Sequence, residues 1–167
     1  MFSRNDAILE MKRTILEARN VNTLKMKWLS PQKMSVTEQQ VKELFSFLET
    51  GQGDRFFEAV ADDVDWLVMP THPTAGHYTS KEEFLNHTIR RVSKLVNGSL
   101  QLEATNILVS GDWSVVELKS KAIANNNVPF TNCYCWLVRW KDGKIVQVRA
   151  YQDSFIASKL IEDNETH

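Results

Sequence analysis

Residues 129–153 read PFTNCYCWLVRWKDGKIVQVRAYQD, two long strand-like runs on either side of a short polar segment. The segment contains Asp142-Gly143, and an Asp-Gly pair between apolar runs is the strongest short-range signal for a β-hairpin. The runs are rich in Val, Ile, Tyr, Trp and Phe, which suit a pleated, half-buried surface. This stretch therefore predicts a two-stranded ribbon of about nine residues a side, long for strands in a globular sheet.

The two faces of this ribbon differ in composition. Alternation along the first run places four residues on one face, Asn132, Tyr134, Trp136 and Val138. The other face holds Cys133, Cys135, Leu137 and Arg139. Neither face is strongly charged, so we expect both to be covered and both cysteines to be buried free thiols. Pairing across the turn adds three residues of the second run to the Tyr134 face, Val146, Val148 and Ala150.

Length and composition favour one main domain. The 167 residues suffice for a sizeable core, and 43% apolar with 25% charged residues is ordinary for a globular protein. A net charge of −1 argues against a nucleic-acid partner. We expect no membrane span, because no apolar run approaches the roughly 18 residues required. The N-terminus has no apolar leader, which favours a cytoplasmic location.

Residues 1–34 differ from the rest of the chain. They contain seven Lys or Arg and only three Asp or Glu, and Ile8, Met11, Ile15 and Ala18 form a helical stripe. We expect an N-terminal helical extension here, and the compact domain at residues 35–163. A basic amphipathic helix can dock on a membrane or partner, while a loosely held extension is the alternative.

The compact domain is predicted to begin with helices. Thr37 and Gln40 form a capping box for a helix to about residue 49, and a short helix follows. Residues 63–69 read as a strand, 70–79 as a loop, and Ser80 with Glu83 begins a third helix. Strands at 100–109 and 113–124 precede the hairpin, and Asp153 caps a terminal helix. This order predicts the α+β class: a strongly curved antiparallel sheet wrapped around three helices, with an internal pocket.

Several short motifs occur together in this order. They are Gly53-Asp54, Asp65-Trp66, Ala75-Gly76-His77-Tyr78, Gly111-Asp112, Asn132-Cys133-Tyr134 and Asp142-Gly143-Lys144-Ile145. Over residues 36–155 the sequence resembles the SnoaL-like branch of the nuclear-transport-factor-2-like superfamily, which has an α+β cone fold. The resemblance implies an apolar substrate held in the cone, no metal or organic cofactor, and a homodimer through the outer face of the sheet. It does not specify a reaction.

The resemblance also suggests catalytic residues. Similarity to the epoxide-hydrolase arrangement favours Glu117 as a general base or acid tuned by Lys119, with a charged solvent-facing edge as the alternative. Tyr134 is the candidate donor to a developing oxyanion. His72 is the candidate proton shuttle, and His77 lies in the same loop.

The expected substrate-binding residues are Asn132, Trp136, Trp66, Lys119, Trp113, Val148 and Ala150. Relatives often have a carboxylate where this chain has Ala150, and this departure places the epoxide-hydrolase reaction in doubt.

The sequence therefore predicts a cofactor-independent acid/base enzyme of isomerase, cyclase or dehydratase type. Its expected substrate is a hydrophobic, oxygenated small molecule, such as a polyketide or terpenoid intermediate. The alternative is a non-catalytic ligand-binding or dimerisation module of the same fold.

Overall fold

The structure is a computed structural model that describes residues 12–13, 35–69 and 71–165. Apart from residues 12 and 13, the helix predicted near the N-terminus lies outside the described residues. The chain divides into two units, Met1–Met34 and Ser35–His167. The second unit contains the fold and is described by itself.

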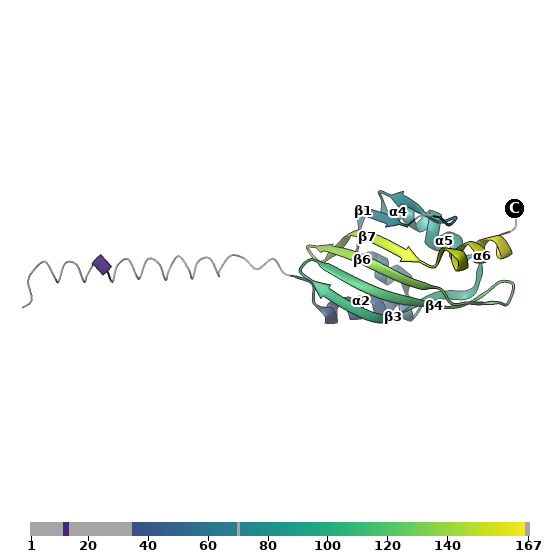
Figure 1. The fold of residues 1–167 in the computed structure, drawn as a ribbon, viewed down its shortest axis with the longest axis horizontal. Coiled ribbons are helices and arrows are strands. Elements are labelled where there is room, and N and C mark those ends of the chain that lie inside the picture. Colours follow the sequence, from purple (N-terminus) through teal and green to yellow (C-terminus); the bar gives the residue numbers. More distant parts are fainter. Residues whose placement is uncertain (1–11, 14–34, 70, 166–167) are drawn as a thin grey trace, which may run out of the picture. The chain divides into compact units, whose positions relative to one another are not determined.

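Helices and strands follow the predicted order (Figure 1), with a short β2 and β5 in addition. The helices are α2 (Glu38–Glu49), α3 (Gly53–Glu58), α4 (Lys81–Phe84), the π-helical η1 (Leu85–Ile89), α5 (Arg90–Ser93) and α6 (Ser154–Asn164). The strands are β1 (Val60–Val68), β2 (Gly76–Tyr78), β3 (Val96–Ser110), β4 (Trp113–Ala124), β5 (Pro129–Phe130), β6 (Cys133–Lys141) and β7 (Lys144–Gln152). The predicted α+β class is confirmed.

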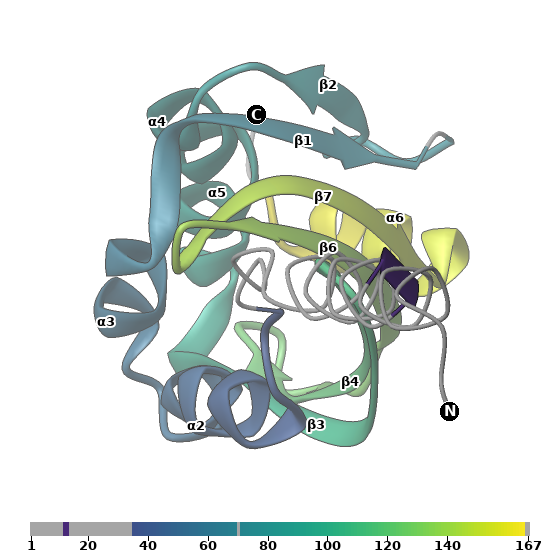
Figure 2. The same ribbon diagram turned by 90° about the vertical axis from the view of Figure 1, so that its left-hand side faces the viewer.

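One curled sheet carries all the strands. Its order is β2-β1-β7-β6-β4-β3, and β5 pairs with β4. The pairings are antiparallel except that of β1 with β7, which is parallel, a detail the sequence did not predict. Figure 2 shows the strong curl, with α2, α3, α4 and α5 together on one side. This arrangement leaves an interior between helices and sheet.

The hairpin forms where predicted. Asp142 and Gly143 both have positive φ, 51° and 77°, as a two-residue type I′ turn requires. A bulge between Arg139 and Trp140 shifts the register of β7. As a result Ile145 is fully buried and Val146 only partly, which corrects the predicted position of Val146.

The helix starts also agree with the sequence. Thr37 and Gln40 make the reciprocal bonds of a capping box, with Gln40 N donating to Thr37 Oγ1 over 3.2 Å. Ser80 Oγ accepts from Glu83 N at the start of α4. Asp153 accepts from the backbone N–H groups of residues 155 and 156, as predicted for the start of α6.

Aromatic rings fill the middle of the core. Trp66 and Phe84 stack with ring centroids 3.8 Å apart, and Trp136 meets Trp66 edge-on at 5.3 Å.

The two cysteines lie outside this core: Cys133 is exposed and Cys135 half-buried. The prediction of two buried thiols is therefore wrong, because this face of β6 is the outer face of the sheet.

Candidate functional site

A small cavity lies between β1, the helical segment α4-η1-α5, and strands β3, β6 and β7. Four residues predicted to bind substrate or catalyse line it: Trp66, Tyr134, Trp136 and Ala150. Its other polar side chains are those of Thr74, Thr88 and Gln152. The volume of the cavity that a water molecule can occupy is about 60 Å³. Since one water needs roughly 10–15 Å³ of such space, a ligand of about four to six non-hydrogen atoms fits.

A π-helical turn forms one wall of this cavity. Phe84, Thr88, Ile89 and Val92 all face the cavity from the segment α4-η1-α5. Thr88 Oγ1 donates to the Phe84 carbonyl over 2.6 Å, so its hydroxyl proton is already used within the helix. Such π-turns occur frequently at functional sites.

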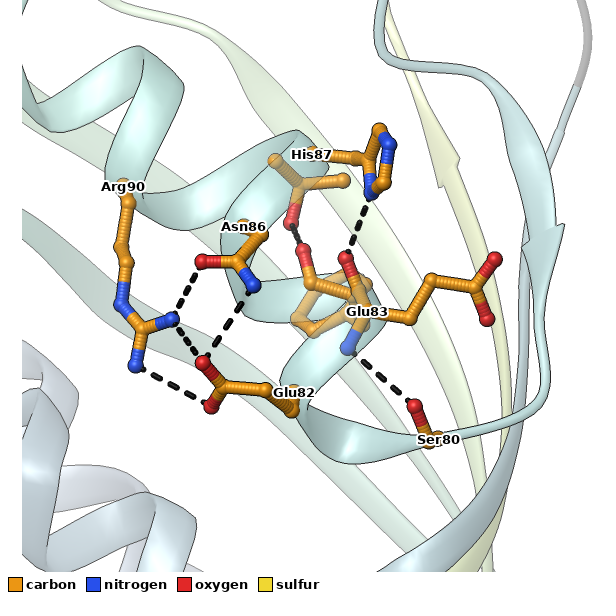
Figure 3. Close-up of polar contacts among 8 residues, drawn as sticks. Ser80, Glu82, Glu83, Asn86, His87 and Arg90 are labelled. Carbon is orange, nitrogen blue, oxygen red and sulfur yellow. Dashed lines mark hydrogen bonds and ion pairs between the residues drawn. The ribbon is translucent and has the colours of Figure 1, made fainter.

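The opposite side of this segment is polar. Arg90 pairs with Glu82 at 2.5 Å and also bonds Asn86, and the ring of His87 bonds the Glu83 carbonyl at 2.9 Å (Figure 3). These contacts lie along one surface of the helix. They satisfy the polar side chains there, and the apolar side is left to form the cavity wall.

Tyr134 supplies a phenol to the cavity wall. Burial raises the pKa of Tyr134 above its ordinary value, and hydrogen bonding to Ser120 and Asn132 offsets this only in part. The hydroxyl therefore stays protonated at neutral pH, suited to donating a hydrogen bond rather than to removing a proton.

Asn132 is fully buried but does not line the cavity. Its backbone N–H donates to Ser120 Oγ over 2.6 Å, and its side-chain Nδ2 donates to the Asp153 carbonyl over 3.2 Å. Its Oδ1 accepts from Cys133 N at 2.7 Å. Asn132 therefore connects the start of β6 to β4 and to the end of β7, and its predicted contact with substrate stays a prediction.

His72 lies just behind the cavity wall. Its Nε2 is 2.8 Å from the Gln152 amide nitrogen, and its Nδ1 is 3.1 Å from Thr74 Oγ1. Burial lowers the pKa of His72, and a hydrogen bond with the Met69 backbone partly opposes this, so the imidazole is neutral at pH 7. The preceding Thr71 has φ 87°, in the left-handed region that β-branched residues rarely adopt. Gln152 and Thr74 separate the ring from the cavity.

Gln152 was missed by the sequence analysis. Its signal was present, because residues 148, 150 and 152 share one face of the last strand. Val148 also points to the interior and is buried, but it does not line the cavity.

Glu117, Lys119 and Trp113 do not reach the cavity. Glu117 pairs with Cys135 and Lys119 with Cys133, so both side chains are on the outer face of the sheet and exposed. Trp113 is on the same outer face, with the guanidinium of Arg139 5.9 Å from its ring. The interior face of β4 carries the apolar Val116 and Leu118, because burial of those side chains costs no desolvation of charge. The predicted cavity position of these three residues is therefore wrong.

His77 also faces outward. Its Nε2 lies 2.5 Å from Asp65 Oδ1, and Gln147 donates to the other oxygen of Asp65 over 2.7 Å. The pair is about half exposed and is separated from the cavity by the backbone of β1.

Two further hollows adjoin the cavity. One, of about 240 Å³, shares Ile89, Leu100, Leu102 and Trp136 with it and has Asp54 on its lining. The other, of about 400 Å³, lies on the outer face and contains Glu117 and Lys119. Tyr134 and Gln152 border both the cavity and the outer hollow. The sheet thus separates an apolar interior from a charged exterior.

Residues 12–13, 35–69 and 71–165 contain no group of three or more His, Cys, Asp or Glu placed to hold a metal ion. Among the helices in that part of the chain, none is both long and apolar enough to cross a membrane.

Comparison with known sequences identifies the family. The SnoaL-like domain family matches residues 41–148, and the chain belongs to this family. A curated relative is the dimerizing cyclase phiC of a fungal species (strain ATCC 74256), which is 25% identical over 134 residues. That match covers 78% of this chain but only 59% of the relative, so the chain spans less than two thirds of that protein.

Solved structures show the same fold. An NTF2-like protein from Burkholderia thailandensis E264 superposes with a TM-score of 0.63 at 18% identity, covering 74% of this chain and 95% of the other. A protein of ketosteroid isomerase-like fold from Catenulispora acidiphila DSM 44928, in complex with trimethylamine, gives 0.58 at 16% identity, covering 77% and 98%. At these identities the likeness establishes the cone fold alone.

Proposed function

We propose that this chain is a cofactor-independent acid–base enzyme of isomerase or cyclase type. Its substrate is a hydrophobic, oxygenated small molecule, such as a polyketide or terpenoid intermediate. The observation that carries the proposal is a protonated phenol, Tyr134, on the wall of an apolar cavity beside the Gln152–His72 pair. The cyclase among the relatives supports this reaction class.

Tyr134 is the proposed donor to the substrate oxygen. When a proton leaves the carbon next to a carbonyl, negative charge develops on the carbonyl oxygen, and a preorganised donor stabilises that charge. A hydroxyl whose pKa is raised by burial keeps its proton at neutral pH and serves this role. The apolar surroundings strengthen the interaction, because water does not screen it.

His72 is the proposed base. The neutral imidazole can accept the proton from carbon and return it to a second carbon, which completes an isomerisation without loss of atoms. The Gln152 amide stands between His72 Nε2 and the cavity, so rotation of that one side chain is needed to bring the ring into contact with substrate.

The cavity holds the reacting end of the substrate rather than all of it. Ligand pockets usually measure roughly 300–1,000 Å³, far above the 60 Å³ found here. The adjoining 240 Å³ hollow, which shares four lining residues with the cavity, offers room for the remainder.

Isomerisation of 3-cyclopentenone to 2-cyclopentenone tests the reaction. This ketone has six non-hydrogen atoms, and its conjugated product is followed by ultraviolet absorbance. We expect the wild-type protein to accelerate the reaction, Tyr134→Phe to slow it by about 10²-fold, and His72→Asn to slow it by about 10²-fold or more. The matched control Glu117→Gln, on the outer face, retains the wild-type rate.

Two results would contradict this assignment. Full activity of both Tyr134→Phe and His72→Asn would remove the proposed roles of these residues. Loss of activity in Glu117→Gln alone would place the reaction at the outer hollow.

One observation favours a second function, a non-catalytic ligand-binding module. Within the described part of the chain, no residue lining the cavity carries a carboxylate, the group that supplies the base in many enzymes of this fold. Saturable binding of cyclopentanone by the wild-type protein, without any isomerisation of 3-cyclopentenone, would support this function over the first.

We further propose a homodimer through the outer face of the sheet. This face exposes Leu108 and Tyr151. The half-buried Val115 lies beside Leu108, and the half-buried Leu137 lies beside Val115 on the next strand. Light scattering should give twice the 19.2 kDa chain mass for the wild type and the single-chain mass for Leu108→Glu. A wild-type mass of one chain at high concentration would refute the dimer.

A further inference from the structure

The hollow that adjoins the cavity carries polar side chains that the proposed reaction does not use. They are the carboxylate of Asp54 on α3 and the hydroxyls of Ser93 on α5 and Ser99 on β3. These residues are distant in the sequence, and the fold brings them to one hollow of about 240 Å³. All three are exposed, so they mark its outer rim.

Asp54 has no partner side chain. Within the described part of the chain, it makes no hydrogen bond and no ion pair, and the same holds for the two serine hydroxyls. Its place in the first turn of α3 is favourable to the helix, but it does not cap it. By contrast, Asp153 caps α6, and Glu82 pairs with Arg90 (Figure 3). The oxygens of Asp54 are therefore available to a ligand.

The inner end of the hollow is apolar. Its boundary with the cavity is formed by four residues that line both spaces, Ile89, Leu100, Leu102 and Trp136. Ile89 and Leu100 are only half-buried, so part of their apolar surface is left for a ligand to cover. A ligand that extends outward from the cavity thus passes apolar side chains first and then meets the polar rim.

The charges at the rim limit which ligand group can bind there. Asp54 repels an anion, and a carboxylate can only accept hydrogen bonds, whereas a serine hydroxyl both donates and accepts. Hydrogen bonding to Glu82 raises the pKa of Arg90, and the charge of Asp54 adds to this effect, so Arg90 is near enough to oppose a second cation at Asp54. A neutral hydroxyl group satisfies both limits, since it can donate to Asp54 and accept from a serine.

We propose that this hollow is the outer part of the ligand site, and that Asp54, with Ser93 and Ser99, binds a hydroxyl group at the far end of the ligand. This inference rests on the proposed function in placing the reacting end of the ligand in the cavity. It adds the chemical class of substrate, a hydrophobic ketone with a hydroxyl group remote from the reacting carbonyl, and the residues that recognise that hydroxyl.

A homologous series of ketones tests the proposal on the unaltered protein. The series consists of 2-(ω-hydroxyalkyl)cyclopentanones whose side chains grow by one carbon at a time. Each is compared with the 2-alkylcyclopentanone in which a methyl group replaces the hydroxyl. The readout is the dissociation constant from titration calorimetry, and the ratio of the two constants is the preference for the hydroxyl. We expect this preference to be largest at one intermediate chain length, at which the hydroxyl reaches the rim.

Asp54→Ala removes the proposed acceptor. At that chain length it should lower the preference for the hydroxyl by about five- to tenfold, the effect of one hydrogen bond to a charged group. Ser99→Ala should lower it by about twofold, the effect of a neutral hydrogen bond. The matched control Glu58→Ala removes an exposed carboxylate from the same helix that does not line the hollow, and it should leave the preference unchanged.

Several results would overturn the proposal. They are an unchanged preference in Asp54→Ala, an equal decrease in Glu58→Ala, and absence of saturable binding by every member of the series. Tighter binding of the matching aminoalkyl ketone would also overturn it, because the recognised group would then be a cation. Unsubstituted cyclopentanone should bind wild type and Asp54→Ala alike, which shows that the variant is folded.

The outcome is separable from that of the catalytic proposal, because these ketones lack the double bond that isomerisation moves. A preference for the hydroxyl that depends on Asp54, without isomerisation of 3-cyclopentenone, leaves this inference standing and removes the proposed reaction. Isomerisation with an unchanged preference in Asp54→Ala does the reverse.

Discussion

The two hollows that share Tyr134 and Gln152 on their linings differ in size and in charge. The inner cavity is small and lined without charge, and one of its lining residues, Trp66, has a buried indole N–H without a hydrogen-bond partner. The outer hollow is several times larger and is lined by Glu117, Lys119, the exposed Cys133 and the half-buried Cys135. Size and charge favour the outer hollow as a site, whereas desolvation favours the inner one. A hydrogen bond to substrate gains most where water is excluded, so chemistry is expected in the smaller space.

The largest expected effect is on the free energy of unfolding. It compares Trp66, on the inner face of the sheet, with Trp113, on the outer face. Trp66→Ala removes a fully buried, stacked ring and should lower the free energy of unfolding by about 3–5 kcal/mol. Trp113→Ala on the outer face should cost about 1 kcal/mol or less. Urea unfolding of both variants measures the difference, and equal losses would mean that the two faces are equally important for the core.

Asparagines offer a second contrast. Asn132→Ala leaves the Asp153 carbonyl and the Cys133 N–H without their partner and should cost about 1–3 kcal/mol. Asn106→Ala, at an exposed position on the outer face of β3, should change stability by about 0.5 kcal/mol or less. If Asn132→Ala lowers the free energy of unfolding by less than Asn106→Ala does, the side-chain amide of Asn132 does not stabilise the start of β6.

We expect the folding stability to depend on pH because of His72. Because burial lowers its pKa in the folded state, the unfolded chain binds the proton more readily as the pH falls below the ordinary histidine value. The stability that this residue contributes is therefore present above pH 6.5 and is lost as the pH falls through the folded pKa.

The measurement is the free energy of unfolding between pH 7.5 and 5. It should fall more steeply with pH for the wild type than for His72→Gln. The control His77→Gln changes a histidine on the exposed side and should retain the wild-type slope. A His72→Gln profile parallel to that of the wild type would contradict the buried neutral imidazole.

The smallest expected effect is on the reactivity of Cys135, on the outer face of the sheet. Burial raises the pKa of the Cys135 thiol, and the neighbouring Glu117 charge raises it further. Glu117→Gln should therefore speed alkylation of Cys135 by iodoacetamide about two- to threefold at pH 7.5, as followed by mass spectrometry. Cys133 in the same protein is the reference thiol. An unchanged ratio of the two rates would show that the charge does not reach Cys135.

Much of the fold could be predicted from local sequence. The Asp142-Gly143 turn, the capping box at Thr37 and the cap at Asp153 each depend on residues within a few positions, and each forms as expected. The alternation along 132–138 likewise placed Tyr134 and Trp136 on the inner face. The register beyond the turn was less predictable, because a bulge moved Ile145 rather than Val146 into the core.

The site was predicted less well, and β4 shows why. Its alternation already separated Val116 and Leu118 from Glu117 and Lys119, yet the resemblance to related enzymes placed the charged pair in the cavity. The structure follows the simpler physical pattern, in which apolar side chains are buried and charged ones remain in water. The position of His72 was not predictable, since it depends on a strained loop and on Gln152, 80 residues away.

By itself, the sequence determined the elements, their caps and the hairpin that closes the sheet, because these depend on propensity, periodicity and turn chemistry between near neighbours. The tertiary structure decided which strand faces enclose space, how small that space is, and that the buried Trp66 N–H is left without a hydrogen-bond partner. Those properties arise from the curl of the sheet and from helices packed against it, contacts between residues far apart in the chain that no local pattern specifies.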